Sequence, residues 1–143
     1  MIEGYKISSN KTDMDFSVIH NFLSSSYWAK DIPEEILRTA IENSLCFGVF
    51  TISENQVGFA RVVTDFATFG YLADVFILEE HRGKGLSKWL MEVIFSHPNL
   101  QNFRRFTLAT RDAHGLYRKF GFKDLAHPEI FMENWVPNAY QKA

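Results

Sequence analysis

A strand pattern that leads through a two-glycine turn into an amphipathic helix most constrains the fold of this chain. Residues 71–78 are almost all apolar, as in a buried strand. Gly83 and Gly85 lie in the turn that follows, and apolar residues then recur at helical spacing from Leu86 to Ile94. Glycine adopts positive φ at little steric cost, so the backbone of this turn is free to approach a ligand closely. The pattern therefore predicts a strand–turn–helix unit.

The other segments alternate between short strand and helix patterns. Strands are expected at residues 3–8, 45–52, 57–63 and 105–110. Helices are expected at residues 13–24, 31–41 and 113–120, with Asp31 as the cap residue of the second. Residues 122–135 are expected to hold one or two closing strands. Antiparallel strands followed by helical crossovers predict an α+β fold, with a mixed, mostly antiparallel central sheet flanked by helices.

Length and composition exclude several classes of protein. The chain of 143 residues suits a single domain, 1–143. Its hydrophobic residues make up 46% of the chain, which is enough to build a core. A formal net charge of −2 argues against a nucleic acid partner. No run approaches the ~18 apolar residues of a membrane span, and no signal peptide is evident, so we expect no membrane partner. The single Cys46 cannot form an internal disulfide, and we expect a cytoplasmic protein.

Basic residues surround the glycine turn and favour an anion-binding site. Arg82, Lys84 and Lys88 lie within or beside the turn. The first turn of the following helix carries unpaired N–H donors and a partial positive charge, which suit a pyrophosphate. A tight strand-to-helix turn with solvated cations is the alternative. The segment is not a nucleotide P-loop, because the four-residue spacer before the Gly-Lys pair is missing.

Two motifs in this part of the chain resemble those of the GCN5-related N-acetyltransferases, the GNAT family. The coenzyme loop of that family has the pattern Arg/Gln-x-x-Gly-x-Gly/Ala. Arg82, Gly85 and Ser87 occupy its three defined positions, and Ser87 departs from the expected Gly or Ala. Residues 113–122 resemble a later motif, in which a tyrosine, here Tyr117, precedes a Gly-Phe pair by four residues. The resemblance implies the GNAT fold, with acetyl-CoA as co-substrate.

The resemblance also implies which residues bind the coenzyme. The loop of the family holds the pyrophosphate, which here points to Arg82, Gly83, Lys84, Gly85, Leu86, Ser87 and Lys88. The strand before the loop pairs its backbone with the pantetheine arm, which points to Val75, Phe76 and Ile77. One N–H group of that strand would polarise the thioester carbonyl.

Tyr117 and Asp74 are the candidate catalytic residues. An amine that attacks a thioester must lose a proton, and the departing thiolate must gain one. The family assigns the second role to the tyrosine that Tyr117 matches, and a phenol packed on the sheet is the alternative. Asp74 interrupts an apolar strand, where alternation places it on one face with Leu72, Phe76 and Leu78. Burial there would raise its pKa and make it a base, whereas a structural contact with Arg61 is the alternative.

The acceptor side of the site is the least defined. In the family, the first two helices and the hairpin region line the acceptor pocket, which here includes Tyr27, Trp28, Arg61, Phe66, Phe69 and Tyr71. Small-molecule amines and peptide amines both stay open as acceptors. Residues 131–137 form an apolar stretch that could contact a second copy in a homodimer.

These motifs together predict an N-acetyltransferase that moves an acetyl group directly from acetyl-CoA to a primary amine in a ternary complex. A non-catalytic CoA-binding module, acting as a sensor or subunit, is the alternative. Cys46 lies in a strand pattern and is expected to be a small buried side chain rather than a nucleophile. The five histidines show no metal-ligand spacing, so we expect no metal.

Overall fold

Five strands form one sheet, in which the order of the strands follows the order of the chain. The computed structural model describes residues 1–141. The strands are β1 (Tyr5–Ser8), β2 (Leu45–Thr51), β3 (Gln56–Thr64), β4 (Phe69–Ile77) and β5 (Arg105–Leu108). Neighbouring strands are antiparallel, except that β5 runs parallel to β4. The predicted mixed, mostly antiparallel sheet is confirmed.

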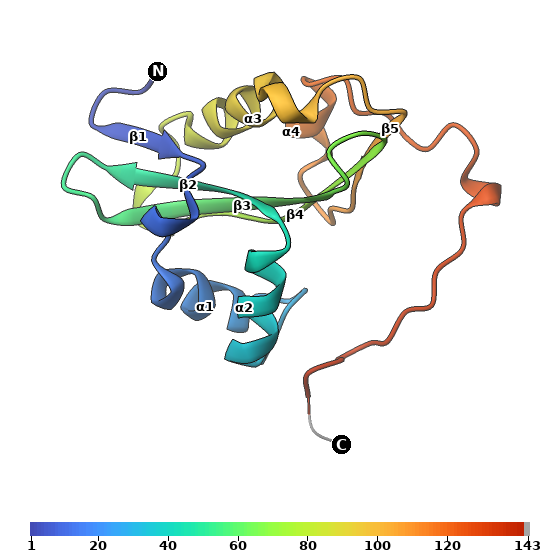
Figure 1. Cartoon of the computed structure of the whole chain (residues 1–143), viewed down its shortest axis with the longest axis horizontal. Coiled ribbons are helices and arrows are strands. Elements are labelled where there is room, and N and C mark those ends of the chain that lie inside the picture. The colour runs from blue at the N-terminus through green and yellow to red at the C-terminus, as the bar shows by residue number, and fades with distance from the viewer. Residues whose placement is uncertain (142–143) are drawn as a thin grey trace.

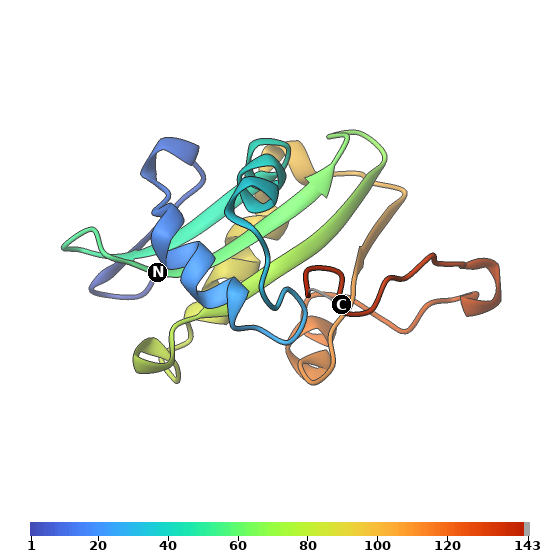
Figure 2. The same ribbon diagram turned by 90° about the horizontal axis from the view of Figure 1, so that it is seen from below.

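Helices cover both faces of this sheet. α3 (Leu86–Ser96) and α4 (His114–Arg118) lie on one face, and α1 (Phe16–Ser24) and α2 (Glu34–Glu42) lie on the other (Figure 1). Figure 2 views the sheet from the side of α1 and α2, with α3 behind the strands. Within residues 1–141, no helix combines the length and the apolar character needed to cross a membrane.

The two helices α1 and α2 are short and differ in how they begin. The side chain of Asp15 caps α1 by accepting a backbone N–H, and Ile19 and Leu23 are buried one turn apart. α2 begins after Pro33, whose fixed φ suits a helix start. The prediction that Asp31 caps this helix is wrong. Asp31 has a left-handed backbone (φ 64°) and lies in the loop before Pro33.

α3 is the amphipathic helix that the apolar spacing predicts. Its residues buried against the sheet are Leu86, Leu90, Met91 and Ile94. Gly85 is the cap residue, with a left-handed backbone. The helix ends at Ser96, shortly before Pro98, because proline cannot continue the hydrogen-bond pattern of a helix.

A β-bulge interrupts β4 at Asp74. Between two paired positions, β4 advances from residue 73 to 76 while β3 advances only from 59 to 61. Asp74 lies at this extra position and has a left-handed backbone (φ 56°). Leu72 therefore packs into the core beneath α3, whereas Phe76 packs into the core on the side of α1. The prediction that Asp74 shares one face with both Leu72 and Phe76 is wrong, because a bulge breaks the alternation.

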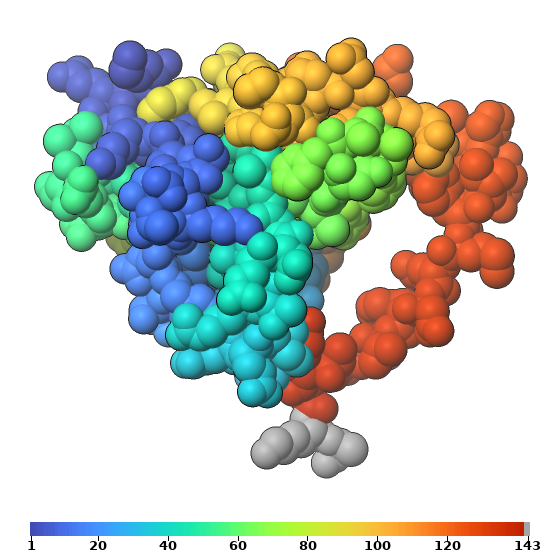
Figure 3. Space-filling model, viewed as in Figure 1, coloured from blue at the N-terminus to red at the C-terminus, as the bar shows by residue number. Residues whose placement is uncertain are grey.

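The chain after α4 contains no strand within the described residues, so the closing strands predicted at 122–135 are wrong. Residues 123–139, which we call the C-terminal arm, are all exposed and hold one 3₁₀ turn, Pro128–Ile130. Figure 3 shows the arm standing away from the body of the molecule. Its sequence favours β structure, but it pairs with no strand of the described chain, and a strand needs a partner for its backbone.

Candidate active site

β4 and β5 diverge, and a cavity of about 860 Å³ opens where they part. Their parallel pairing extends only from Phe69 and Arg105 to Leu72 and Leu108. β5 ends there, whereas β4 continues to Ile77. The cavity is lined by this second half of β4, by the connection from β5 to α4, and by the loop between α1 and α2. One edge of β4 therefore offers its backbone groups to the cavity instead of to a neighbouring strand.

The glycine turn borders this cavity, which Arg82 and Ser87 help to line. Gly83 and Gly85 both have positive φ, 78° and 84°, so the predicted backbone freedom is used. A Cβ on Gly83 would meet no atom within 4 Å, and a Cβ on Gly85 would meet only Ile2, at 3.6 Å. Backbone conformation, and not crowding within the chain, is therefore what favours glycine here.

The start of α3 leaves backbone donors free for an anion. The N–H of Trp89 bonds to the carbonyl of Gly85 at 3.1 Å, so the N–H groups of residues 86–88 have no acceptor within the helix. The side chain of Leu86 is buried in the core, and only its backbone can serve a ligand. Lys84 and Lys88 are exposed beside these donors and add positive charge.

Two hydrogen bonds hold the turn in place. Nε of Arg82 donates to the carbonyl oxygen of Ile77 at 2.8 Å, which fixes the turn to the end of β4. The hydroxyl of Tyr5 lies 2.8 Å from Nδ1 of His81, which ties the turn to β1. The residues just before the glycine turn are therefore tied to two strands of the sheet, β4 and β1.

Val75, Phe76 and Ile77 line the cavity at the open edge of β4. The ring of Phe76 stacks on Phe22, with ring centroids 4.1 Å apart, and the residue is buried. What Phe76 can offer a ligand is thus its backbone. The open edge of β4 has backbone groups that β5 does not pair, as the expected main-chain contacts require. The contacts with the pantetheine arm themselves remain a prediction.

Tyr117 comes from α4 and lines the same cavity, although the residue as a whole is only 8% exposed. Its ring packs edge-on against Phe122, with ring centroids 6.1 Å apart. Burial raises the pKa of the phenol above its usual value, and the nearby Asp112 and Tyr27 raise the pKa further. Tyr117 therefore carries its proton at neutral pH, as a proton donor must.

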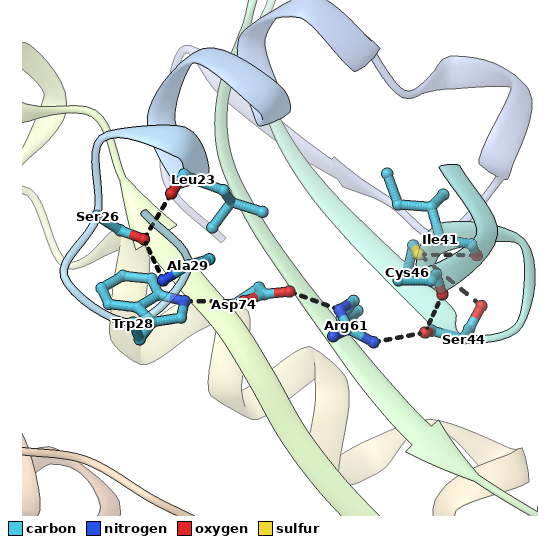
Figure 4. Close-up of polar contacts among 10 residues, drawn as sticks. Leu23, Ser26, Trp28, Ala29, Ile41, Ser44, Cys46, Arg61 and Asp74 are labelled. Carbon is cyan, nitrogen blue, oxygen red and sulfur yellow. Dashed lines mark hydrogen bonds and ion pairs between the residues drawn. The ribbon is translucent and has the colours of Figure 1, made fainter. Parts of the chain in front are cut away.

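Asp74 is the centre of a chain of polar contacts (Figure 4). Its Oδ2 accepts from Nε of Arg61 at 2.6 Å, and its Oδ1 accepts from Nε1 of Trp28 at 2.8 Å. Arg61 in turn donates to the hydroxyl of Ser44 at 3.0 Å. The side chain of Asp74 is only 9% exposed, yet the residue lines the cavity. The ion pair with Arg61, which the sequence left as one of two interpretations, is present, and the role of a base stays a prediction.

The structure brings four of the six expected acceptor-side residues to the cavity, namely Tyr27, Trp28, Arg61 and Tyr71. Phe66, in the turn between β3 and β4, and Phe69, the first residue of β4, are exposed and do not line the cavity. The sequence missed Arg111, whose guanidinium lies 3.8 Å from the centroid of the Tyr27 ring, and Tyr140. Arg111 directly follows an expected strand and could have been found, whereas nothing local marks Tyr140.

Cys46 belongs to β2 and is fully buried against α1 and α2, as its strand context predicts. Burial raises the pKa of its thiol to about 11, so it is a protonated thiol at neutral pH. Among residues 1–141, no group of three His, Cys, Asp or Glu side chains is arranged to hold a metal ion.

Comparison with known proteins decides the family of this chain. The model of the acetyltransferase (GNAT) domain matches residues 42–124, a span that contains the glycine turn, the open edge of β4 and Tyr117. The chain belongs to the GNAT family of acetyltransferases. The resemblance stated from the loop and tyrosine motifs is therefore confirmed.

Individual relatives agree with the GNAT assignment. A Gibberella zeae protein, named as a candidate acetyltransferase, is 35% identical over 84% of this chain and 80% of its own length. A GNAT protein from Xanthomonas campestris pv. campestris is 48% identical, and its crystal structure gives a TM-score of 0.96 over 99% of this chain and 100% of that one. Glucosamine-6-phosphate N-acetyltransferase from Arabidopsis thaliana is 17% identical, with a TM-score of 0.61 over 93% and 99% of the two chains. That last likeness concerns the fold alone.

Proposed function

We propose that this GNAT protein transfers an acetyl group from acetyl-CoA directly to a primary amine, within a ternary complex. The observation that carries the proposal is that the glycine turn, the open edge of β4 and Tyr117 all border one cavity. A ligand with a diphosphate and an amide-rich arm needs an anion site and a row of backbone partners. A thioester at its end needs a proton donor for the departing sulfur.

The residues proposed to bind the coenzyme fit its chemistry. The free N–H groups of residues 86–88 suit the diphosphate, and Arg82, Lys84 and Lys88 add charge around it. Gly83 has open space where a side chain would stand, so the backbone there can approach the ligand. The backbone of Val75, Phe76 and Ile77 is proposed to pair with the pantetheine arm. One N–H of that strand would polarise the thioester carbonyl.

The proposed reaction is an acyl transfer whose atoms balance. The amine nitrogen forms a bond to the carbonyl carbon of the thioester, and the bond from that carbon to sulfur breaks. The nitrogen loses a proton, and the sulfur leaves as a thiolate that takes up a proton. The acetyl-CoA supplies the activated acyl group, and the protein supplies position, a carbonyl-polarising N–H and the two proton transfers.

Tyr117 is proposed to protonate the departing thiolate. Its raised pKa keeps the proton on the phenol until a base forms beside it. A thiolate at the same buried place is also destabilised by the apolar surroundings, because burial disfavours either anion. The proton transfer between the two therefore stays close to balanced, as general acid catalysis needs.

Asp74 is proposed to assist removal of the proton from the amine, through a water molecule. It is a carboxylate on the cavity wall, and a carboxylate has about four lone-pair positions, of which Trp28 and Arg61 take two. The same contacts hold Asp74 in one orientation. Its competing role is to position Trp28 and Arg61 at the acceptor side, and the kinetics of the Asp74→Asn variant distinguish the two roles.

Direct transfer is favoured over a covalent acyl-enzyme by the state of the one cysteine in the sequence. Cys46 is fully buried and does not line the cavity. With a pKa of about 11, its thiol is not the thiolate that a covalent relay would need at neutral pH.

The test is to incubate the full chain with acetyl-CoA and a panel of primary amines, and to follow the release of free thiol. The panel should include small alkyl, aromatic and amino-acid amines and short peptides. We expect at least one amine to raise thiol release well above the rate in buffer, with an acetylated amine as the product. Tight CoA binding with no release above buffer across the panel would favour the non-catalytic module instead.

A further inference from the structure

The C-terminal arm exposes a continuous series of large apolar side chains to solvent. Its exposed large apolar residues are Leu125, Ile130, Phe131, Met132, Trp135 and Val136. Met132 is 97% exposed and Trp135 is 71% exposed. Scattered apolar residues are normal on a protein surface, but a continuous segment of this kind marks an interaction site.

The arm is held at both ends, so it projects as a loop. Phe122, just before the arm, packs against Phe106 and Phe95 in the core beneath α3. Tyr140, just after it, packs against the core on the side of α1 and lines the cavity. Between these two anchors the arm pairs with no strand of the described chain, and its large apolar side chains stay exposed. Its apolar side chains therefore point to a partner outside this chain.

The sheet offers an edge that matches the arm. β5 pairs with β4 on one side only, and among residues 1–141 no strand pairs with its other side. Such an edge has unpaired N–H and C=O groups and accepts an additional strand. The arm leaves the body beside this edge, because the guanidinium of Arg105, at the start of β5, lies 4.8 Å from the centroid of the Phe131 ring.

The charges of the two surfaces are complementary. The edge begins with the exposed Arg104 and Arg105, and residues 103–108 contain no acidic residue. The arm contains the acidic residues Asp124, Glu129 and Glu133 and a single basic residue, Lys123. Glu133 lies among the most apolar residues of the arm and, within the described residues, forms no salt bridge. One chain thus carries both an acidic, apolar segment and a basic strand edge, and within the described residues no strand pairing and no salt bridge joins the two.

We propose that two copies of this chain form a homodimer by exchanging their arms, residues 131–136 of each copy adding a strand to the free edge of β5 in the other. A two-fold arrangement satisfies both arms and both edges and leaves neither open. Specific protein interfaces bury at least ~1,000 Å² in total, and two exchanged arms with six large apolar side chains each supply an area of that order. This proposal is independent of the acetyl transfer proposed above.

The first experiment measures the mass of the full chain in solution by light scattering, over a series of concentrations. We expect twice the mass of one chain, and we expect Trp135→Ser to raise the dimer dissociation constant at least tenfold. Ile52→Ser is the matched control, since Ile52 is a similarly exposed apolar residue (66%) at the other end of the molecule, in the β2–β3 turn. A wild-type chain that is monomeric throughout would overturn the proposal and leave the arm to a different protein. A dimer that Trp135→Ser weakens no more than Ile52→Ser would also overturn it.

A charge exchange tests which surfaces meet. Glu133→Arg gives a copy whose segment 131–136 and edge are both basic, and the double variant Arg104→Glu, Arg105→Glu gives a copy whose segment 131–136 and edge are both acidic. Each variant alone should be mainly monomeric, because like charges face each other at both contacts. An equimolar mixture should form a heterodimer in which both contacts join opposite charges. If each variant alone dimerises as the wild type does, or if the mixture stays monomeric, the arm does not bind this edge.

Discussion

The replacement Gly85→Val tests whether the glycine turn is a binding site or only a connection. Gly85 has φ 84° and ψ 13°, a left-handed conformation that costs an L-residue ~1–2 kcal/mol, and a β-branched residue more. A Cβ there meets only Ile2 at 3.6 Å, so internal crowding adds little. We therefore expect a loss of stability of ~2 kcal/mol, which lowers the Tm by roughly 4–8 °C for a chain of this length.

The effect on coenzyme binding should be larger than the loss of stability explains. The new side chain would lie directly before the free N–H groups of residues 86–88, which are proposed to bind the diphosphate. The loss of one hydrogen bond to a charged phosphate costs ~1.5–3 kcal/mol. That corresponds to a fall in CoA affinity of about tenfold to more than a hundredfold. Isothermal titration of the folded variant with CoA, well below its Tm, measures this directly.

Gly4→Val is the matched control for this experiment. Gly4 also has a positive φ of 86°, a Cβ there would meet no atom within 4 Å, and the residue does not line the cavity. It should lose a similar amount of stability and keep its affinity for CoA. If Gly85→Val binds CoA as tightly as Gly4→Val does, the turn is a structural connection and the proposed coenzyme site is wrong.

Three further predictions concern the side chains of the site and the buried cysteine. Tyr117→Phe keeps the packing against Phe122 and should lower turnover by ~10²–10⁴ with CoA affinity almost unchanged; equal losses in turnover and affinity, by kinetics and titration, would make Tyr117 structural. Asp74→Asn should lower kcat with CoA affinity and Tm almost unchanged, whereas a raised KM for the amine at an unchanged kcat would leave Asp74 a positioning residue. Cys46→Ala should remove a decline in stability of roughly 3 kcal/mol between pH 9 and 11, because the unfolded thiol loses its proton from pH 9.0 and the folded thiol only at about 11. Urea unfolding across this range measures that decline, and an equal slope in the variant would contradict the assignment.

The parts of the molecule that are specified locally could be predicted from the sequence. The apolar stripe of α3 and the positive φ of Gly83 and Gly85 depend on residues close together in the chain, and the structure confirms both. The buried Cys46 follows from its strand context in the same way. A ligand cavity could be expected only from the family resemblance. The divergence of β4 from β5, which forms the cavity, depends on where β5 ends, and β5 is distant from β4 in the sequence.

The errors lie where a distant contact decides the local structure. Residues 122–135 have the composition of strands, but a strand forms only beside a partner, and within the described residues the arm has none. The Asp31 error is the exception and is local: Asp31 is a good cap residue by type, but the helix begins after Pro33, two residues later. Tyr140 reaches the cavity through the path of the arm, which no local pattern encodes.

The bulge at Asp74 joins the two halves of the site, and it explains why the choice of Asp74→Asn matters. A bulged strand bends, and here the extra residue lies just beyond Leu72, where β4 stops pairing with β5. Asp and Asn tolerate the left-handed backbone better than most residues, so Asn retains both the bulge and a hydrogen bond from Trp28. Alanine would add backbone strain and lose both contacts, and the cavity would change shape together with the charge. The carboxylate of Asp74 has two candidate roles, as a proton acceptor and as a support for the bend in β4. Asp74→Asn separates these roles, because it removes the charge and leaves the bend in place.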